Sequence, residues 1–185
     1  PLHLAQFAVM GRVYSREIMG RTNPRVGLLC NGTEETKGND LTRGALKLCR
    51  QLDLNFLGYI EGHDLFEDHV DVVVTDGFVG NIVLKTIESM GKGFKTMLEA
   101  ELRRNPLRMA GAALAYGGLR QIKRRMNPDN YGGAPLLGLN GSVIKAHGSA
   151  RALAIRNAIR VACETVHNKI NQVMQAEVAR ANLVA

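Results

Sequence analysis

The stretch from Asp71 to Lys85, DVVVTDGFVGNIVLK, places the strongest constraint on what this chain can fold into. Its run Val72–Thr75 is apolar and β-branched, which is typical of a buried strand in a parallel sheet. The run stops at Asp76-Gly77, and from about residue 81 apolar residues recur at helical spacing. A strand, a glycine turn and a helix form the unit from which open α/β sheets build their binding sites.

This turn is a candidate anion site. A helix N-terminus offers unpaired backbone N–H groups to an anion, and Gly77 and Gly80 allow the backbone to approach a ligand closely. Asp76 and Asn81 supply polar atoms where the strand ends. An ordinary turn between a strand and a helix has the same pattern, and on the local pattern alone it is the favoured interpretation.

The rest of the chain alternates helical and strand patterns. We expect helices over 2–19, 41–52 and 81–104, and strands over 26–30, 55–60 and 142–146. Ser149 is a plausible N-cap for a last helix that reaches about residue 180. Its apolar face is expected to carry Ile155, Ile159, Ala162, Val166, Ile170 and Val173. This order of elements predicts an α/β fold with a largely parallel sheet.

A basic segment stands out between residues 103 and 126. It contains seven basic residues and no acidic one, a local excess equal to the net charge of +7 of the whole chain. Residues 107–119 between them are almost all apolar, so we expect a helical hairpin at about 88–128 with an apolar tip and basic sides. A basic patch indicates an acidic partner, namely nucleic acid, an anionic membrane or an acidic protein. The basic residues are Arg103, Arg104, Arg108, Arg120, Lys123, Arg124 and Arg125.

The nucleic-acid and membrane interpretations of the basic segment each have an argument against them. A nucleic-acid module is disfavoured because aromatic residues make up only 5% of the chain. For the apolar tip, a contact between subunits or the edge of a core helix is a serious alternative to a membrane.

Cysteine usage and the acidic residues indicate no metal site. The three cysteines are widely spaced in apolar contexts, which is typical of buried, reduced thiols in the cytosol; they are Cys30, Cys49 and Cys163. The acidic residues that we considered as a cluster fit no recognised ligand pattern; they are Glu34, Glu35, Asp64 and Asp76. His63 and His69 flank a loop, and we interpret both as surface residues.

Four stretches together resemble one family. They are NGTEETKGND at 31–40, DVVVTDGFVGNIVLK at 71–85, YGGAPLLGLNG at 131–141 and VIKAHGSA at 143–150. In this order they resemble the bacterial phosphate acyltransferases of phospholipid synthesis, which convert acyl-acyl-carrier protein and phosphate into acyl phosphate. The resemblance covers nearly the whole chain and implies that residues 1–185 are the C-terminal part of a longer acyltransferase domain. The sequence opens on Pro1 without a signal-peptide pattern, which also favours a fragment or processed product.

The resemblance has further implications. The family's fold is a three-layer α/β/α sandwich similar to phosphotransacetylases and isocitrate-dehydrogenase-like enzymes. The family forms homodimers and acts without a metal or nicotinamide cofactor. We therefore expect no cofactor, a cytoplasmic protein associated peripherally with membrane, and no nucleic-acid partner.

Residue roles follow from the resemblance together with loop position. Lys37 and Asn81 are the catalytic candidates, as charge and amide donor, although a solvated loop lysine is the commonest alternative for Lys37. His147 is expected to share the crevice edge with Asp76 if their strands are parallel, and a histidine satisfied by hydrogen bonds is the alternative. The substrate-binding candidates are Asp76, Gly77, Gly80, Gly132, Gly133, Lys145, His147, Gly148 and Ser149. The membrane-contact candidates are Leu107, Met109, Leu114, Tyr116 and Leu119.

Three functions therefore remain open. The first is acyl transfer from acyl-acyl-carrier protein to inorganic phosphate. The second is a related enzyme of the phosphotransacetylase kind. The third is a membrane-docking or scaffold fragment without catalysis.

Overall fold

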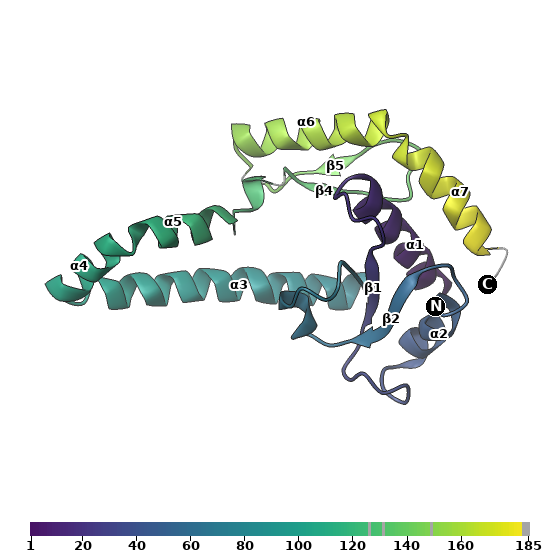
Figure 1. Cartoon of the computed structure of the whole chain (residues 1–185), viewed down its shortest axis with the longest axis horizontal. Coiled ribbons are helices and arrows are strands. Elements are labelled where there is room, and N and C mark those ends of the chain that lie inside the picture. The colour runs from purple at the N-terminus through teal and green to yellow at the C-terminus, as the bar shows by residue number, and fades with distance from the viewer. Residues whose placement is uncertain (126, 131, 149, 183–185) are drawn as a thin grey trace. The chain divides into compact units, whose positions relative to one another are not determined.

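The computed structural model describes residues 1–125, 127–130, 132–148 and 150–182 (Figure 1). The chain divides into two compact units. The first joins Pro1–Thr75 to Gly132–Ala185, and the second is Asp76–Tyr131.

A three-stranded parallel sheet forms the centre of the first unit. Its order is β2-β1-β3, with β1 at Arg25–Leu29, β2 at Asn55–Ile60 and β3 at Val72–Val74. Four of the five residues of β1 are buried, as expected for a strand that is paired on both edges and covered on both faces.

Two helices pack with this sheet. They are α1 (Leu2–Glu17) and α2 (Asp40–Cys49), while a short 3₁₀ helix, η1 (Asp64–Phe66), lies between β2 and β3. The largest core cluster draws on both helices and all three strands; it comprises Leu4, Ala5, Ala8, Val26, Leu28, Ala45, Leu46, Cys49, Tyr59 and Val74. The predicted α/β fold with a parallel sheet is confirmed, and the arrangement is consistent with the predicted α/β/α sandwich.

The last helix is broken in two, which corrects the prediction of one continuous helix. α6 spans Ala152–His167 and α7 spans Ile170–Asn182, and Lys169 between them has a positive φ of 52°. An L-residue in this left-handed conformation does not continue an α-helix. The N-cap of α6 is Arg151, without a side-chain cap bond. The predicted cap, Ser149, lies outside the described residues.

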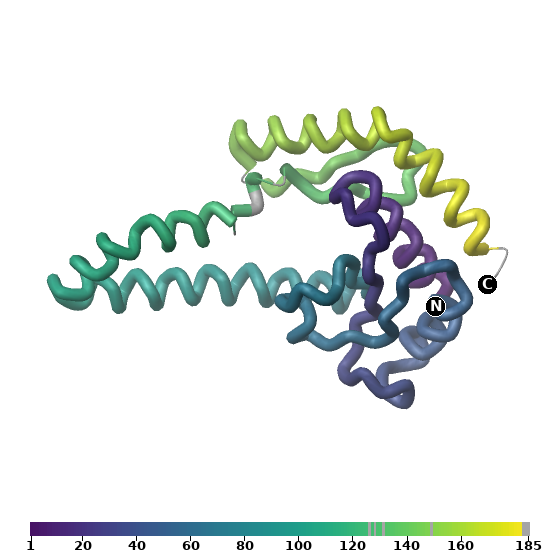
Figure 2. Tube along the Cα trace, in the orientation of Figure 1, coloured from purple at the N-terminus to yellow at the C-terminus, as the bar shows by residue number. Residues whose placement is uncertain are grey.

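Over α6, most of the apolar face predicted for this helix is exposed in this chain. Ile155, Ile159 and Val166 are 46%, 60% and 66% exposed. The buried residues of α6 are instead Ala154, Val161 and Thr165. In α7, by contrast, Ile170 is fully buried in a cluster with Met10, Val13 and Met174, so α7 packs on α1 of the same chain (Figure 2).

A carboxylate also joins α1 to α7. Glu177 forms ion pairs with Arg12 and with Arg16, whose Nη2 lies 2.9 Å from Glu177 Oε1. Burial raises the pKa of Glu177, but the hydrogen bonds from Arg16 and Arg12 outweigh it and hold the pKa below its ordinary value. The first and last helices of the chain are therefore joined by both apolar and ionic contacts.

The strand predicted over 142–146 is short and lies outside the main sheet. β4 (Ala134–Pro135) and β5 (Ile144–Lys145) pair with each other in an antiparallel ladder. The two-stranded ribbon is separate from the parallel sheet.

The second unit consists of helices. α3 spans Gly77–Leu102, α4 spans Pro106–Leu114 and α5 spans Tyr116–Arg125, followed by a 3₁₀ turn, η2, at Pro128–Asn130. α4 lies at the end of α3, and α5 leads back from it (Figure 1). α3 begins four residues earlier than predicted and runs through Gly91 and Gly93 without interruption.

The cysteines differ in their surroundings. Cys49 is buried, and burial raises the pKa of its thiol to about 11, so it is unreactive. Cys30 is half-buried and Cys163 is exposed, which corrects the prediction that all three are buried.

The starts of β1 and β3 are held together by Arg25 and Asp71. Asp71 Oδ2 accepts hydrogen bonds at 2.9 Å from both the backbone N–H and the Nε of Arg25, and Arg21 Nε lies 3.5 Å from Asp71 Oδ1. The side-chain bond from Arg25 is the main cause that lowers the pKa of Asp71 from 3.8 to about 2.

We expect Asp71→Asn to lower the free energy of unfolding at neutral pH by about 1–3 kcal/mol, as for hydrogen bonds to a charged group. Because the folded-state pKa of about 2 lies below the ordinary 3.8, this stabilisation is present above about pH 4 and lost as the pH falls toward about 2. Urea unfolding across this interval should show wild type and variant converging. Asp68→Asn is the matched control, because its side chain is 94% exposed and lies 3.8 Å from Arg25. A difference between wild type and Asp71→Asn that does not change with pH would contradict the assignment.

Candidate functional site

The loop after β1 is pinned by one asparagine. Asn31 Oδ1 accepts a hydrogen bond of 3.0 Å from the backbone N–H of Gly38 and lies 3.4 Å from Cys30 Sγ. Gly38 has a φ of +81°, and a Cβ there would lie 2.2 Å from Thr42 Oγ1. Asn39 then begins α2 with a capping box shared with Thr42. These bonds give the loop a defined shape at the carboxyl end of β1.

Lys37 lies at the exposed side of this loop. A Cβ built on Gly32 would lie 2.8 Å from Lys37 Cγ, so the stem of the lysine crosses the buried Gly32. Among the described residues, the Lys37 ammonium has no carboxylate partner within ion-pair distance. The neighbouring Glu35 is held by Arg50 at 2.5 Å, and this hydrogen bond lowers the pKa of Glu35. Lys37 is therefore the cation in this loop that is available to an anionic ligand.

A buried phenol lies beneath the same loop. Tyr59, in β2, is 6% exposed, and its hydroxyl lies 3.3 Å from a Cβ built on Gly38. Within the described part of the chain, this hydroxyl has no hydrogen-bond partner. Tyr59 cannot be singled out from the sequence alone, because a tyrosine in an apolar strand is indistinguishable from a core residue.

Asp76 begins α3 as its N-cap. Its Oδ1 accepts hydrogen bonds from the N–H groups of Phe78 at 2.9 Å and Val79 at 3.0 Å. The carboxylate thus occupies the donors that we expected an anion to use. Gly77 and Gly80 lie in the first turn and neither has a positive φ.

Asn81 is exposed one helical step further along. It lies on one side of α3 with Lys85 and Ser89, in a depression of about 440 Å³. Asp76, Gly77, Gly80 and Asn81 all belong to the second unit, whereas Lys37 belongs to the first.

Packing explains the consecutive glycines 132 and 133. Gly132 has a φ of +85°, and a Cβ on it would lie 2.4 Å from the backbone of Asn157 and Ala158 in α6. Gly133 has a φ of +153°, and its Cβ would lie 2.8 Å from the Lys145 carbonyl oxygen. Both glycines are therefore required by the close approach of β4 to α6 and β5, whatever their role toward a substrate.

The remaining candidates lie on and after β5. Lys145, His147 and Gly148 are exposed, and the His147 carbonyl accepts a hydrogen bond of 2.9 Å from the Ala150 N–H. Because β5 is antiparallel to β4 and separate from the parallel sheet, the premise that placed His147 at the crevice edge is wrong. The substrate role of His147 stays a prediction without that premise, and Ser149 lies outside the described residues.

The hairpin candidates are exposed, with one exception. Leu107, Met109, Leu114 and Tyr116 are 83%, 55%, 91% and 62% exposed, whereas Leu119 is half-buried. No described helix is both long enough and apolar enough to cross a membrane.

The seven basic residues of the hairpin are also exposed. Arg104 and Arg108 both form ion pairs with Glu101, which lies just before the basic segment. Arg104 Nη1 is 3.4 Å from Glu101 Oε1. The charge available to a partner is thus smaller than the sequence count indicates.

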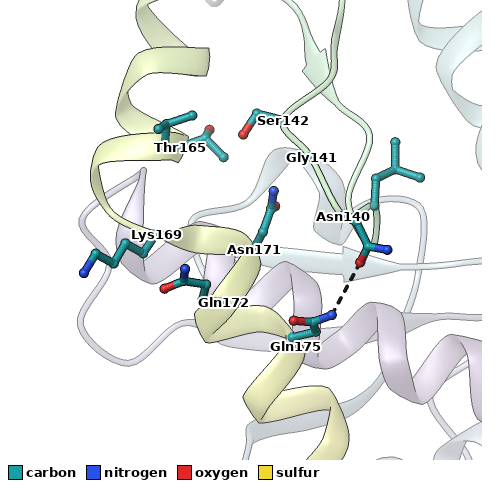
Figure 3. Close-up of a pocket in the computed structure, with 10 residues that line it drawn as sticks. Asn140, Gly141, Ser142, Thr165, Lys169, Asn171, Gln172 and Gln175 are labelled. Atoms are coloured by element: carbon teal, nitrogen blue, oxygen red, sulfur yellow. Dashed lines mark hydrogen bonds between the residues drawn. The ribbon is translucent and has the colours of Figure 1, made fainter.

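A pocket of about 430 Å³ lies between the loop that joins β4 to β5 and the junction of α6 with α7 (Figure 3). Its rim is rich in amide and hydroxyl groups, and the Gln175 Nε2 lies 3.4 Å from Asn140 Oδ1. None of the predicted site residues lines it. This pocket cannot be predicted from the sequence, because the helix break at Lys169 that helps to form it has no glycine or proline to signal it.

Comparison with known proteins identifies the family. Residues 1–173 match the family described as "Fatty acid synthesis protein". This chain belongs to that family. A protein of Akkermansia muciniphila named "Phosphate acyltransferase" is 45% identical over 190 aligned positions, which cover 100% of this chain and 54% of the relative.

Two further relatives carry the same printed name. The one from Geotalea uraniireducens is 48% identical over 94% of this chain and 50% of its own length, and the one from Pelotomaculum thermopropionicum is 49% identical over 92% and 50%. The resemblance to phosphate acyltransferases is therefore confirmed. The chain spans about half the length of the relatives that it matches.

The packing of Gly132 leads to a stability prediction. We expect Gly132→Ala to lower the free energy of unfolding by at least about 2 kcal/mol, from backbone strain and overpacking together. Gly148→Ala is the control, because nothing lies within 4 Å of its built Cβ, and its effect should stay within about 0.5 kcal/mol. Thermal unfolding of both variants measures this, and equal effects would contradict the packing role.

Proposed function

We propose that this chain is part of an enzyme that transfers the acyl group of acyl-acyl-carrier protein to inorganic phosphate and so forms acyl phosphate for phospholipid synthesis. The observation that carries the proposal is the exposed ammonium of Lys37 on a pinned loop at the carboxyl end of β1. Open α/β sheets bind their ligands outside the carboxyl ends of the strands. The printed name of the relatives supports the same activity.

The chemistry makes modest demands on the protein. A phosphate oxygen attacks the thioester carbonyl, a tetrahedral oxyanion forms, and its collapse breaks the C–S bond and releases the carrier thiolate, which takes a proton from solvent. Because phosphate is a nucleophile at neutral pH, no activated serine or cysteine is needed. Positioning supplies about 7–11 kcal/mol of the barrier in favourable cases, and donors at the oxyanion supply several more.

Lys37 and Asn81 fit these needs by their chemistry. An ammonium group attracts phosphate and stabilises negative charge, and a carboxamide N–H₂ donates hydrogen bonds to an oxyanion. In this proposal the Asp76 carboxylate orders the first turn of α3, which Asn81 directly follows, and repels a second anion from the N–H groups that it occupies.

We expect Lys37→Ala and Asn81→Ala each to lower turnover at least tenfold while the fold is kept, since loss of one oxyanion donor costs about a hundred- to a thousandfold. Mass spectrometry of acyl phosphate formed from acyl-carrier thioester and phosphate measures this, with the Akkermansia muciniphila relative as the positive control. Lys47→Ala, which changes an exposed lysine of α2, should leave turnover unaltered. Near-wild-type turnover in a folded Lys37→Ala/Asn81→Ala double variant would exclude the assignment.

We also propose that the protein is cytoplasmic and docks peripherally on anionic membrane through the hairpin. The exposure of Leu107 and Leu114 at 83% and 91% supports this, together with the basic side chains that flank them. Each basic residue near a charged leaflet contributes about 1 kcal/mol, and each buried methylene about 0.8 kcal/mol. Binding should therefore be reversible, sensitive to salt and dependent on anionic lipid.

Leu107→Glu combined with Leu114→Glu should release the protein from anionic vesicles, with turnover of soluble substrate nearly unchanged. Both side chains are exposed, so the fold has no need of them. Met19→Glu is the matched control, because Met19 is an apolar residue with 62% exposure outside the hairpin. Vesicle sedimentation at low salt tests this, and wild type that ignores anionic vesicles would disprove membrane docking.

A homodimer is the third part of the proposal. Ile170 of α7 is buried against α1 of its own chain, so it lends no support. The exposed apolar residues of α6, Ile155, Ile159 and Val166, are available instead. Light scattering should give twice the mass of one chain, and Ile159→Lys should shift it toward the single-chain mass. A wild-type protein that scatters as a monomer at high concentration would disprove this contact.

A further inference from the structure

The backbone of Lys37 is held on both sides of its Cα atom. The Lys37 N–H donates a hydrogen bond of 3.0 Å to the Glu34 carbonyl, and the Gly38 N–H donates one of 3.0 Å to Asn31 Oδ1. These two N–H groups belong to the peptide units just before and just after the Lys37 Cα. The point at which the side chain leaves the loop is therefore fixed, and contacts further along the stem decide where the ammonium lies.

Gly32 makes the close contact with that stem. A Cβ built on Gly32 would lie 2.8 Å from Lys37 Cγ and 3.2 Å from Lys37 Cδ. Gly32 is buried, and its φ is not positive, so its backbone conformation is open to other residues. Gly38 differs, because its φ of +81° itself favours glycine. The side chain of Lys37 is thus one reason for a glycine at position 32 that the backbone does not supply.

We propose that Gly32 is a positioning residue that aims the Lys37 ammonium at the ligand site beyond the carboxyl end of β1. The inference rests on the proposed function, in which Lys37 attracts phosphate. A Cβ at position 32 would have to displace the lysine stem by about 1 Å to restore an ordinary contact of 3.4–4 Å. A misplacement of about 1 Å can lower a rate about a hundredfold.

Glu34 occupies the same space from another side. Its Oε2 would lie 2.8 Å from the Cβ built on Gly32, so an added methyl group would meet this carboxylate as well as the lysine. An effect of the methyl group through Glu34 is the competing explanation. Combining the substitution at Gly32 with substitutions of Lys37 and Glu34 separates the two explanations.

The test is Gly32→Ala in the complete enzyme of which this chain is part. We expect kcat/KM for phosphate to fall about ten- to a hundredfold and the KM for the acyl-carrier thioester to stay unchanged. The melting temperature should not fall, because alanine suits this backbone and the lysine stem is flexible. Gly62→Ala is the matched control, because no described atom lies within 4 Å of its built Cβ in the loop after β2. It should behave as wild type.

The double variants decide the cause. The loss caused by Gly32→Ala should disappear in a Lys37→Ala background and persist in a Glu34→Gln background. Wild-type kinetics in Gly32→Ala, or a loss that persists without Lys37, would overturn the inference. So would a fall in melting temperature that Lys37→Ala does not restore, since the role of Gly32 would then lie in the backbone. Wild-type kinetics in folded Lys37→Ala would instead exclude the proposed role of Lys37, and this inference with it.

Discussion

The pairing of β1 with a neighbour on each edge is the interaction on which the rest of the first unit depends. Because β2 and β3 both run parallel to β1, the loops that follow β1 and β2 leave the sheet at the same edge. As a result, the loop that Asn31 holds in place lies next to Tyr59. The connection that contains η1 starts at the same edge of the sheet, after β2. At the other edge of the sheet, the hydrogen bonds between Arg25 and Asp71 hold the starts of β1 and β3 together.

The fold could be predicted where the local pattern and the tertiary contacts agree. β2 has the predicted bounds, because a short apolar run flanked by polar residues is typical of a strand and of little else. α3 begins earlier than predicted because the Asp76 side chain caps it, and two glycines in its first turn masked that start. The break at Lys169 could not be predicted, since it depends on Ile170 packing against α1, a contact between distant parts of the chain.

The candidate site divides along similar lines. Lys37 could be placed from sequence on an exposed loop after a strand, and the structure adds the asparagine that shapes that loop. For Gly132 and Gly133, sequence alone does not distinguish a ligand approach from the observed approach of α6 and β5. Gly32 lies in an ordinary Asn-Gly turn by sequence, and only the structure shows that the Lys37 stem crosses it.

The contact of α1 with α7 has a consequence for synthesis of the protein. The residues joined by the Arg12–Glu177 ion pair are 165 positions apart. At about 5–20 residues per second, a ribosome needs on the order of ten to thirty seconds to make the intervening chain. During that time Met10 and Val13 of α1 lack their partners Ile170 and Met174, and the nascent chain exposes an apolar surface that is prone to aggregation. Closure of the first unit is therefore a late event that awaits the synthesis of α7.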